Sequence, residues 1–240
     1  MKKIIKSWIQ SSVDFIADRK VVTSIEKSQK GIAFKDSQRF IYENSCLGTL
    51  TFSSHVSLRE HCVLNAPKNG LLLEFGVYKG KSINFMASVL DRLEDERLIY
   101  GFDSFEGFSE EWSGVDRRYQ KKHFDQSGKL PAVNARVRLV PGFIEDTLPS
   151  FVADVGNDAI AFVHIDTDTY TPAFTILSQL QGKFVAGTIV LFDEYCGYPN
   201  WRSHEHAALT EVVERDRYEF IGFAQSQSGA NLVKAAIRIN

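Results

Sequence analysis

The stretch that decides the fold is "GLLLEFGVYKG", residues 70–80, followed at once by "KSINFMASVLDRL", residues 81–93. The first run is apolar and closed by glycine, which is typical of a buried strand that ends in a tight turn. In the second run apolar residues recur near helical spacing, at Ile83, Phe85, Met86, Val89, Leu90 and Leu93. Together the two runs predict a strand, a glycine turn and a helix.

Similar strand signals recur along the rest of the chain. They are "RLIYGFDSF" (97–105), "ARVRLVPGF" (135–143), "AIAFVHIDTD" (159–168) and "GTIVLFDEY" (187–195), with helical patterns between several of them. Alternation of strand and helix predicts a mostly parallel sheet with helices on both faces. In such a sheet, ligands bind at the carboxyl ends of the strands.

The C-terminal tail has a different pattern. "YEFIGFAQS" (218–226) and "ANLVKAAIRI" (230–239) are two strand-like runs that lie too close together for a parallel crossover. We therefore expect the chain to end in an antiparallel hairpin. A parallel sheet closed in this way is typical of class I methyltransferases rather than of nicotinamide dehydrogenases.

Composition narrows the class of partner. The net charge of −2, from 28 basic and 30 acidic residues, gives no positive field to attract nucleic acid or an anionic membrane. No apolar run is long enough for a membrane span, and the three cysteines form no C-x-x-C pair, so neither a disulfide framework nor a thiolate zinc site is indicated. These features predict a soluble, cytoplasmic protein with a small-molecule partner.

Three further segments carry predictions. Residues 1–68 are helix-leaning and charged, and are expected to form an N-terminal cap on a core of residues 69–240. The long polar segment 109–128 is a candidate lid, and residues 195–209 look like a substrate-facing loop that runs into a helix.

Several residues at the predicted strand ends suit a nucleotide. Glu74, Gly76 and Gly80 lie at the glycine turn, where the backbone must turn tightly and approach a ligand, although a plain strand-to-helix turn would look the same. Asp103 ends the next strand, where a carboxylate can accept both hydroxyls of a ribose; the alternative is a helix cap or a surface acid. Gly142, Phe143 and Ile144 follow the third strand and could cover one face of a base.

Acidic residues follow two strands that should be neighbours in the sheet. Asp166 ends one of them, and Asp193 with Glu194 ends the other. Three clustered carboxylates repel one another unless a cation or protons intervene, and such oxygen-rich sites suit Mg²⁺. Asp168 is expected to cap the following helix, and His164 to be a buried, hydrogen-bonded histidine.

The motifs "EFGVYKGKSI", "GFDSFEGF", "VPGFIEDTLP", "HIDTDTYTP" and "GTIVLFDEY" occur in this order over residues 70–215. In this order and spacing the chain resembles the macrocin/mycinamicin-type O-methyltransferases. The resemblance implies a Rossmann-like class I methyltransferase fold of the α/β class, with a mostly parallel seven-stranded sheet, an antiparallel C-terminal hairpin and an N-terminal helical cap. It also implies S-adenosylmethionine and Mg²⁺ as cofactors, a hydroxylated small-molecule acceptor such as a sugar or glycoside, and self-association into a homo-oligomer.

The resemblance also implies roles for individual residues. Asp166 would be the catalytic base, and Asp166, Asp193 and Glu194 would hold the metal, although Asp-Asp is typical of the family where this chain has Asp193-Glu194. The cofactor-binding residues would be Glu74, Gly76, Tyr78, Gly80, Ser82, Asp103, Ser104, Phe105, Gly142, Phe143, Ile144 and Asp166.

Two other functions are compatible with parts of the pattern. A nicotinamide-linked Rossmann oxidoreductase is disfavoured because Gly76 and Gly80 do not form G-x-G-x-x-G and because the terminal hairpin does not suit it. A cofactor-binding protein without catalysis stays open because of the change to Glu194.

Overall fold

In the computed structural model of the protein, the apolar run at residues 70–77 forms the central strand β2 (Leu71–Phe75). The structure describes residues 2–107, 124–225 and 231–240, with side chains from residue 23 onward. Most of the predicted lid, residues 109–128, therefore lies outside the described residues. The glycine turn leads into α3 (Lys81–Arg92), as the sequence predicts.

The remaining elements follow in chain order. The helices are α1 (Lys2–Asn44), α2 (His55–Asn65), α4 (Ile144–Asp154), α5 (Tyr170–Leu180) and α6 (Glu205–Val212), with short 3-10 turns at Gln181–Lys183, Trp201–Ser203 and Arg215–Arg217. The other strands are β1 (Leu50–Phe52), β3 (Ile99–Asp103), β4 (Val137–Pro141), β5 (Ile160–Ile165), β6 (Phe184–Cys196), β7 (Tyr218–Gln225) and β8 (Val233–Ile239).

Within the described residues one sheet of eight strands runs in the order β1-β7-β8-β6-β5-β2-β3-β4. Strand β8 is antiparallel to both β6 and β7, and the other pairs are parallel. This confirms the mixed, mostly parallel sheet and the terminal hairpin. The structure adds β1, an edge strand from the region expected to be helical, which pairs with β7. The division at residue 68 stays a prediction.

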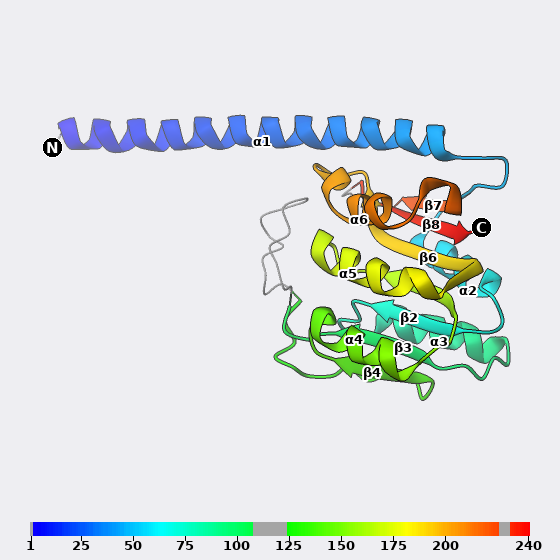
Figure 1. The fold of residues 1–240 in the computed structure, drawn as a ribbon. Coiled ribbons are helices and arrows are strands. Elements are labelled where there is room, and N and C mark those ends of the chain that lie inside the picture. Colours follow the sequence, from blue (N-terminus) through cyan, green and yellow to red (C-terminus); the bar gives the residue numbers. More distant parts are fainter. Residues whose placement is uncertain (1, 108–123, 226–230) are drawn as a thin grey trace.

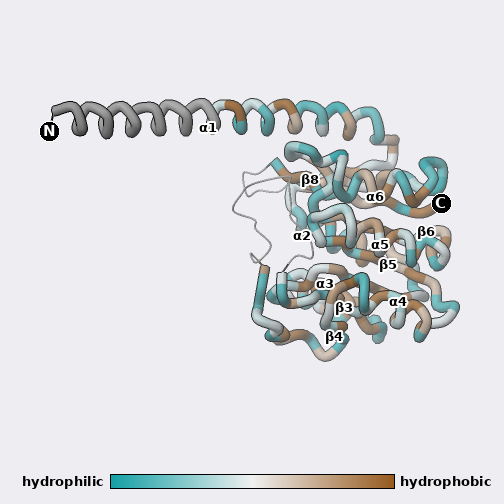
Figure 2. Tube along the Cα trace, turned by 60° about the vertical axis from the view of Figure 1, so that its left-hand side comes forward, coloured by the Kyte–Doolittle hydropathy of each residue, from teal (hydrophilic) through white to brown (hydrophobic). Residues whose placement is uncertain are grey.

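Helices cover both faces of the sheet (Figure 1). Helices α4, α5 and α6 lie on one face and α2 and α3 on the other, and each face has its own apolar cluster. The strands are predominantly hydrophobic, whereas the helices carry many hydrophilic positions, as Figure 2 shows. Because β2, β3, β5 and β6 are parallel neighbours, their carboxyl ends meet at one edge of the sheet.

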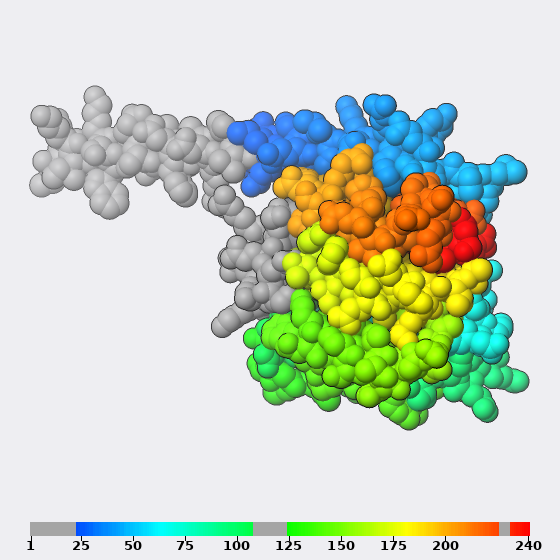
Figure 3. Space-filling view, in the orientation of Figure 1, coloured from blue at the N-terminus to red at the C-terminus, as the bar shows by residue number. Residues whose placement is uncertain are grey.

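The C-terminal part of α1 packs beside the segment that follows β6 (Figure 3). The ring of Phe40 lies 5.2 Å from that of Trp201, and Asp36 accepts a hydrogen bond from the Trp201 indole at 3.1 Å. Tyr195 and Trp201 are buried and both pack against Phe40, so this part of the predicted substrate-facing loop lies against α1. None of the described helices contains an apolar stretch that could cross a membrane.

Candidate functional site

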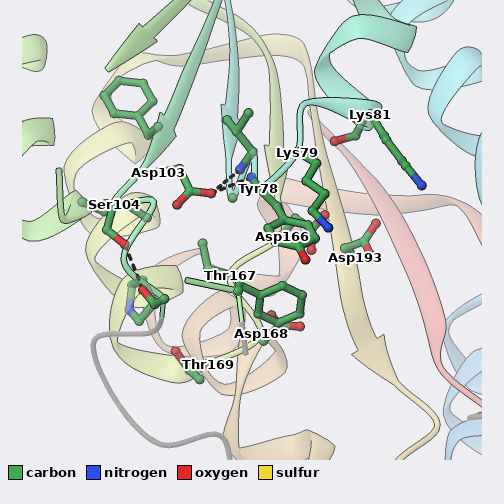
Figure 4. Close-up of a pocket in the computed structure, with 18 of the residues that line it drawn as sticks. Tyr78, Lys79, Lys81, Asp103, Ser104, Asp166, Thr167, Asp168, Thr169 and Asp193 are labelled. Carbon is green, nitrogen blue, oxygen red and sulfur yellow. Dashed lines mark hydrogen bonds between the residues drawn. The ribbon is translucent and has the colours of Figure 1, made fainter. Parts of the chain in front are cut away.

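A cavity of about 610 Å³ opens at the carboxyl ends of β2, β3 and β5 (Figure 4). Asp103 and Ser104 lie on one side of it, and Asp166, Asp168 and Asp193 on the other. Predicted site residues that line it are Gly76, Tyr78, Ser82, Asp103, Ser104, Phe143, Ile144, Asp166 and Asp193. Glu74, Gly80, Phe105, Gly142 and Glu194 adjoin these residues but are not among the described lining residues.

The glycine turn joins the two sides of this cavity. Gly76 has φ +92°, and a Cβ at this position would lie 1.9 Å from the backbone oxygen of Asp166. Only glycine fits such an approach, because any side chain would push the end of β2 away from the end of β5. The turn therefore fixes the position of Asp166 at the cavity wall.

Asp103 stabilises that turn through hydrogen bonds to its backbone. Its Oδ2 accepts hydrogen bonds from the backbone N–H groups of Val77 (2.8 Å) and Tyr78 (2.7 Å), and its Oδ1 accepts one from Phe105 (2.7 Å). A carboxylate offers about four lone-pair positions, so about one remains for a ligand in this arrangement. Hydrogen bonding of Asp103 to both ribose hydroxyls stays a prediction. Its hydrogen bonds to the glycine turn are a role that the sequence did not reveal.

Asp193 lies in a group of alternating charges, here called the paired cluster: Glu74, His164, Asp193, Arg59 and Lys234. Arg59 donates to Asp193 Oδ1 at 3.2 Å, and the Lys234 ammonium forms an ion pair with Oδ2. The ring of His164 bridges two acids, with Nδ1 2.9 Å from Glu74 Oε1 and Nε2 3.2 Å from Asp193 Oδ1. All five side chains are buried, which confirms the prediction of a buried, hydrogen-bonded His164.

The pKa shifts of Asp193, His164 and Lys234 all favour the charged forms of these groups. Burial by itself would raise the pKa of Asp193, but the Lys234 charge and the His164 hydrogen bond hold it well below its usual range. Burial would lower the pKa of His164, yet the hydrogen bonds to Asp193 and Glu74 outweigh this and raise it. The pKa of Lys234 is likewise raised, because Asp193 outweighs the effect of burial.

Four other acids form what we call the carboxylate cluster: Asp166, Asp168, Glu194 and Glu205. Carboxylate oxygens of the first three lie within 4.8 Å of one another. Glu205, from the start of α6, accepts a hydrogen bond from the backbone N–H of Glu194 at 3.2 Å. In contrast to Asp193, none of the four forms an ion pair with a basic side chain within the described ranges.

The pKa values of all four acids are raised. For Asp166, burial together with the nearby Asp193 charge raises the pKa to about 7. Burial, followed by repulsion from neighbouring acids, places the pKa values of Asp168, Glu194 and Glu205 well above their usual range. The cluster therefore needs protons or a cation to be stable at neutral pH.

Strand geometry explains why the acids divide in this way. Successive side chains of a strand point to opposite faces, and Leu191 packs in the α2/α3 cluster while Phe192 packs in the other. Asp193 therefore faces Arg59 of α2, and Glu194 faces α6. The same alternation places Lys234 with Ala236 on the α2/α3 side.

Asp168 does not cap the next helix as predicted. The N-cap of α5 is Thr169, without a side-chain cap hydrogen bond, and Asp168 has φ +64° with its side chain buried. The sequence analysis also missed Arg59 and Lys234. The signal for Lys234 was its place inside the apolar strand pattern "NLVKAAI", where an unpaired charge would be costly.

Known proteins resemble this chain in sequence. Residues 73–195 match a family model described as "Methyltransferase domain". The 8-demethyl-8-(2,3-dimethoxy-alpha-L-rhamnosyl)-tetracenomycin-C 4'-O-methyltransferase of Streptomyces olivaceus is 30% identical, with 57% of this chain and 58% of that protein covered. The demethyldecarbamoylnovobiocin O-methyltransferase of Streptomyces niveus is 26% identical, with 54% of each covered. The chain thus spans little more than half the length of these relatives.

Solved structures resemble it in fold. The calicheamicin methyltransferase CalS11 superposes with a TM-score of 0.60 at 25% identity, with 76% of each chain covered. The O-methyltransferase NovP superposes with a TM-score of 0.51 at 20% identity, with 77% of this chain and 79% of that chain covered. Both likenesses agree with the Rossmann-like class I fold.

Proposed function

The chain belongs to the methyltransferase-domain family, and we propose that it transfers a methyl group from S-adenosylmethionine to a hydroxyl oxygen of a small polar acceptor. The observation that carries this proposal is the position of Asp166. It lines the cavity next to the glycine turn and has a pKa of about 7. A general base with a pKa near the operating pH is well suited to accept a hydroxyl proton.

The names of the relatives support a sugar as acceptor. The Streptomyces olivaceus relative is named for methylation of a rhamnosyl compound, and the Streptomyces niveus relative for an O-methylation in the novobiocin series. We therefore propose a glycoside or another hydroxylated natural product as acceptor. Homo-oligomerisation stays a prediction.

The cavity suits the nucleoside cofactor. Its volume lies within the usual range for small-molecule sites, and it lies at the carboxyl ends of parallel strands, where such sheets bind ligands. When bound, S-adenosylmethionine supplies an electrophilic methyl group on a sulfonium. We propose that Tyr78, Ser82, Asp103 and Phe143, which line the cavity, hold this cofactor.

The residues of the chain have two tasks in this reaction. The cavity walls orient the acceptor hydroxyl and exclude water, because methyl transfer depends chiefly on alignment of donor and acceptor. Asp166 accepts the hydroxyl proton as the oxygen forms its new bond to the methyl carbon. The products are then a methyl ether and S-adenosylhomocysteine.

The predicted magnesium triad of Asp166, Asp193 and Glu194 does not fit a metal as its side chains lie here. Asp193 is held by Arg59, Lys234 and His164, so a metal ion would have to compete with all three for its two oxygens. A dication beside Arg59 and Lys234 would also be repelled by both. No step of the proposed reaction passes through a metal at this triad.

The proposal is tested by calorimetric titration of the full chain with S-adenosylhomocysteine, followed by methyl-transfer assays on rhamnosides. We expect Asp166→Asn to bind S-adenosylhomocysteine as the unchanged protein does, and to lower the transfer rate by about 10²- to 10⁴-fold. The matched control is Asp158→Asn, which changes an exposed acid that does not line the cavity among the described residues.

The outcomes separate the competing functions. Absence of S-adenosylhomocysteine binding would overturn the proposal and leave a nicotinamide cofactor to be tested. Binding with no transfer to any acceptor would favour a cofactor-binding protein without catalysis. Full activity in Asp166→Asn would remove Asp166 as the base.

A further inference from the structure

His55, the first residue of α2, lines the cavity and leaves its hydrogen-bonding capacity unused. The ring is partly buried, and neither of its nitrogens has a hydrogen-bond partner among the described residues. Nδ1 is shielded from water, whereas Nε2 is accessible. Because a few polar groups on the wall of a binding cavity orient the ligand, Nε2 is available for a contact of this kind.

A chain of contacts places His55 on the same side of the cavity as the proposed base. Residues four apart on a helix lie on one face, so His55 lies one turn before Arg59, and both line the cavity. Arg59 contacts Asp193 at 3.2 Å, and carboxylate oxygens of Asp193 and Asp166 lie within 4.8 Å of each other. Asp103, which ends the neighbouring strand β3, lies on the opposite side (Figure 4).

The charge state of His55 indicates what it can bind. Burial, followed by the charges of Lys234 and Arg59, lowers the pKa of His55, so its ring is neutral at neutral pH. A neutral imidazole has one N–H donor and one acceptor nitrogen. A hydroxyl group both donates and accepts, so it can form a hydrogen bond with Nε2 in either tautomer.

We propose that His55 binds a second hydroxyl of the acceptor, in addition to the one that Asp166 deprotonates, and so selects acceptors that carry at least two hydroxyl groups. This inference rests on the proposed methyl transfer and defines its acceptor more closely, as a polyol. Two separate polar contacts fix the orientation of a small ring, and methyl transfer depends on that orientation. An analogue without the second hydroxyl would be disfavoured, because Nε2 would then lose its partner.

The test combines variants of the full chain with acceptor analogues, because loss of one hydrogen bond must then show on both partners. The probes are methyl α-L-rhamnoside and those of its monodeoxy analogues that keep the methylated hydroxyl. His55→Phe keeps a ring and removes both nitrogens, and it breaks no hydrogen bond within the described ranges. We expect it to lower kcat/KM for the rhamnoside by about 10- to 100-fold. For the analogue that lacks the hydroxyl bound by His55, the change should be below about threefold, because no hydrogen bond remains to be lost.

Two further variants separate binding from a structural role. His55→Gln offers an amide nitrogen in place of Nε2 and should restore part of the activity on the rhamnoside. His61→Gln is the matched control, because His61 lies on the same helix and is not among the described residues that line the cavity. Calorimetric titration should give the same affinity for S-adenosylhomocysteine in all three variants.

Each unfavourable result has a defined meaning. Unchanged kcat/KM for the rhamnoside in His55→Phe would overturn the proposal, and so would an equal loss on the rhamnoside and on every deoxy analogue. If the protein binds S-adenosylhomocysteine but methylates none of these sugars, a sugar hydroxyl is not the ligand of His55. Absence of S-adenosylhomocysteine binding would overturn the proposed function itself, and this inference with it.

Discussion

Asp193 and Glu194 are neighbours in one strand, yet their side chains lie in opposite electrostatic surroundings. On the α2/α3 side, two acids of the paired cluster meet three basic groups. On the α5/α6 side, Asp168, Glu194 and Glu205 form no ion pair within the described residues, and Asp166 lies between the two groups, within 4.8 Å of atoms in both. The difference teaches that the residue type does not decide what an acid does at a strand end. The face on which it lies decides it, because that face determines which distant residues it meets.

The largest effect on stability is expected from removing Asp193, the acid that contacts all three basic groups of the paired cluster. Asp193→Ala should lower the free energy of unfolding by about 3–5 kcal/mol, because it leaves Arg59, Lys234 and His164 buried around a missing charge. Asp168→Ala, on the other side of the comparison, should cost less, since it relieves repulsion among acids. Urea unfolding of both variants at pH 7 measures the difference.

Equal losses in the free energy of unfolding would contradict the proposed difference between the surroundings of Asp193 and those of Asp168. A change in the slope of the urea curve for Asp193→Ala would point to an effect on the unfolded state instead.

Replacing Lys234, a basic partner of Asp193, should lower the free energy of unfolding by a smaller amount. Lys234→Met should cost about 1–3 kcal/mol, less than loss of Asp193, because Arg59 and His164 still neutralise that acid. Methionine keeps much of the volume of lysine and adds no polar atom.

The double variant Asp193→Ala, Lys234→Met sharpens the result. If the two groups act as one pair, its loss of stability should be well below the sum of the single losses. Additive losses in urea unfolding would contradict direct coupling between Asp193 and Lys234.

Much of the fold could be predicted because its signals are local. The glycine turn after residues 70–75, the parallel strands and the terminal hairpin follow from apolar runs, turn residues and short spacings. The meeting of Asp166 and Asp193 at one edge also follows, because their strands are neighbours. The alternation of side chains already implies that Asp193 and Glu194 diverge, and this step could have been taken from the sequence alone.

What the sequence hid are contacts between distant segments. Arg59 reaches Asp193 across 134 residues, and Lys234 reaches it across 41. No periodicity encodes which basic residue pairs with which acid. The same holds for Trp201, whose aromatic surroundings suggested a substrate loop although it packs against Phe40 of α1, and for β1, whose three residues are too few for a strand signal.

The smallest expected effect concerns pH. The pKa of Asp168 is raised in the folded protein, because burial and the Asp166 charge disfavour its ionised form. Between the ordinary pKa of a carboxyl, about 4, and the raised value, the unfolded chain binds fewer protons than the folded one, so this group lowers stability as the pH rises. For Asp193, stability changes with pH in the opposite direction. Its lowered pKa contributes stability that is present above pH 4 and lost as the pH falls through the folded value.

Asp168→Asn cannot lose a proton, so its stability relative to that of the unchanged protein should rise as the pH rises from 5 to 8. Urea unfolding without added metal measures this gain, and parallel curves for the two proteins would contradict it.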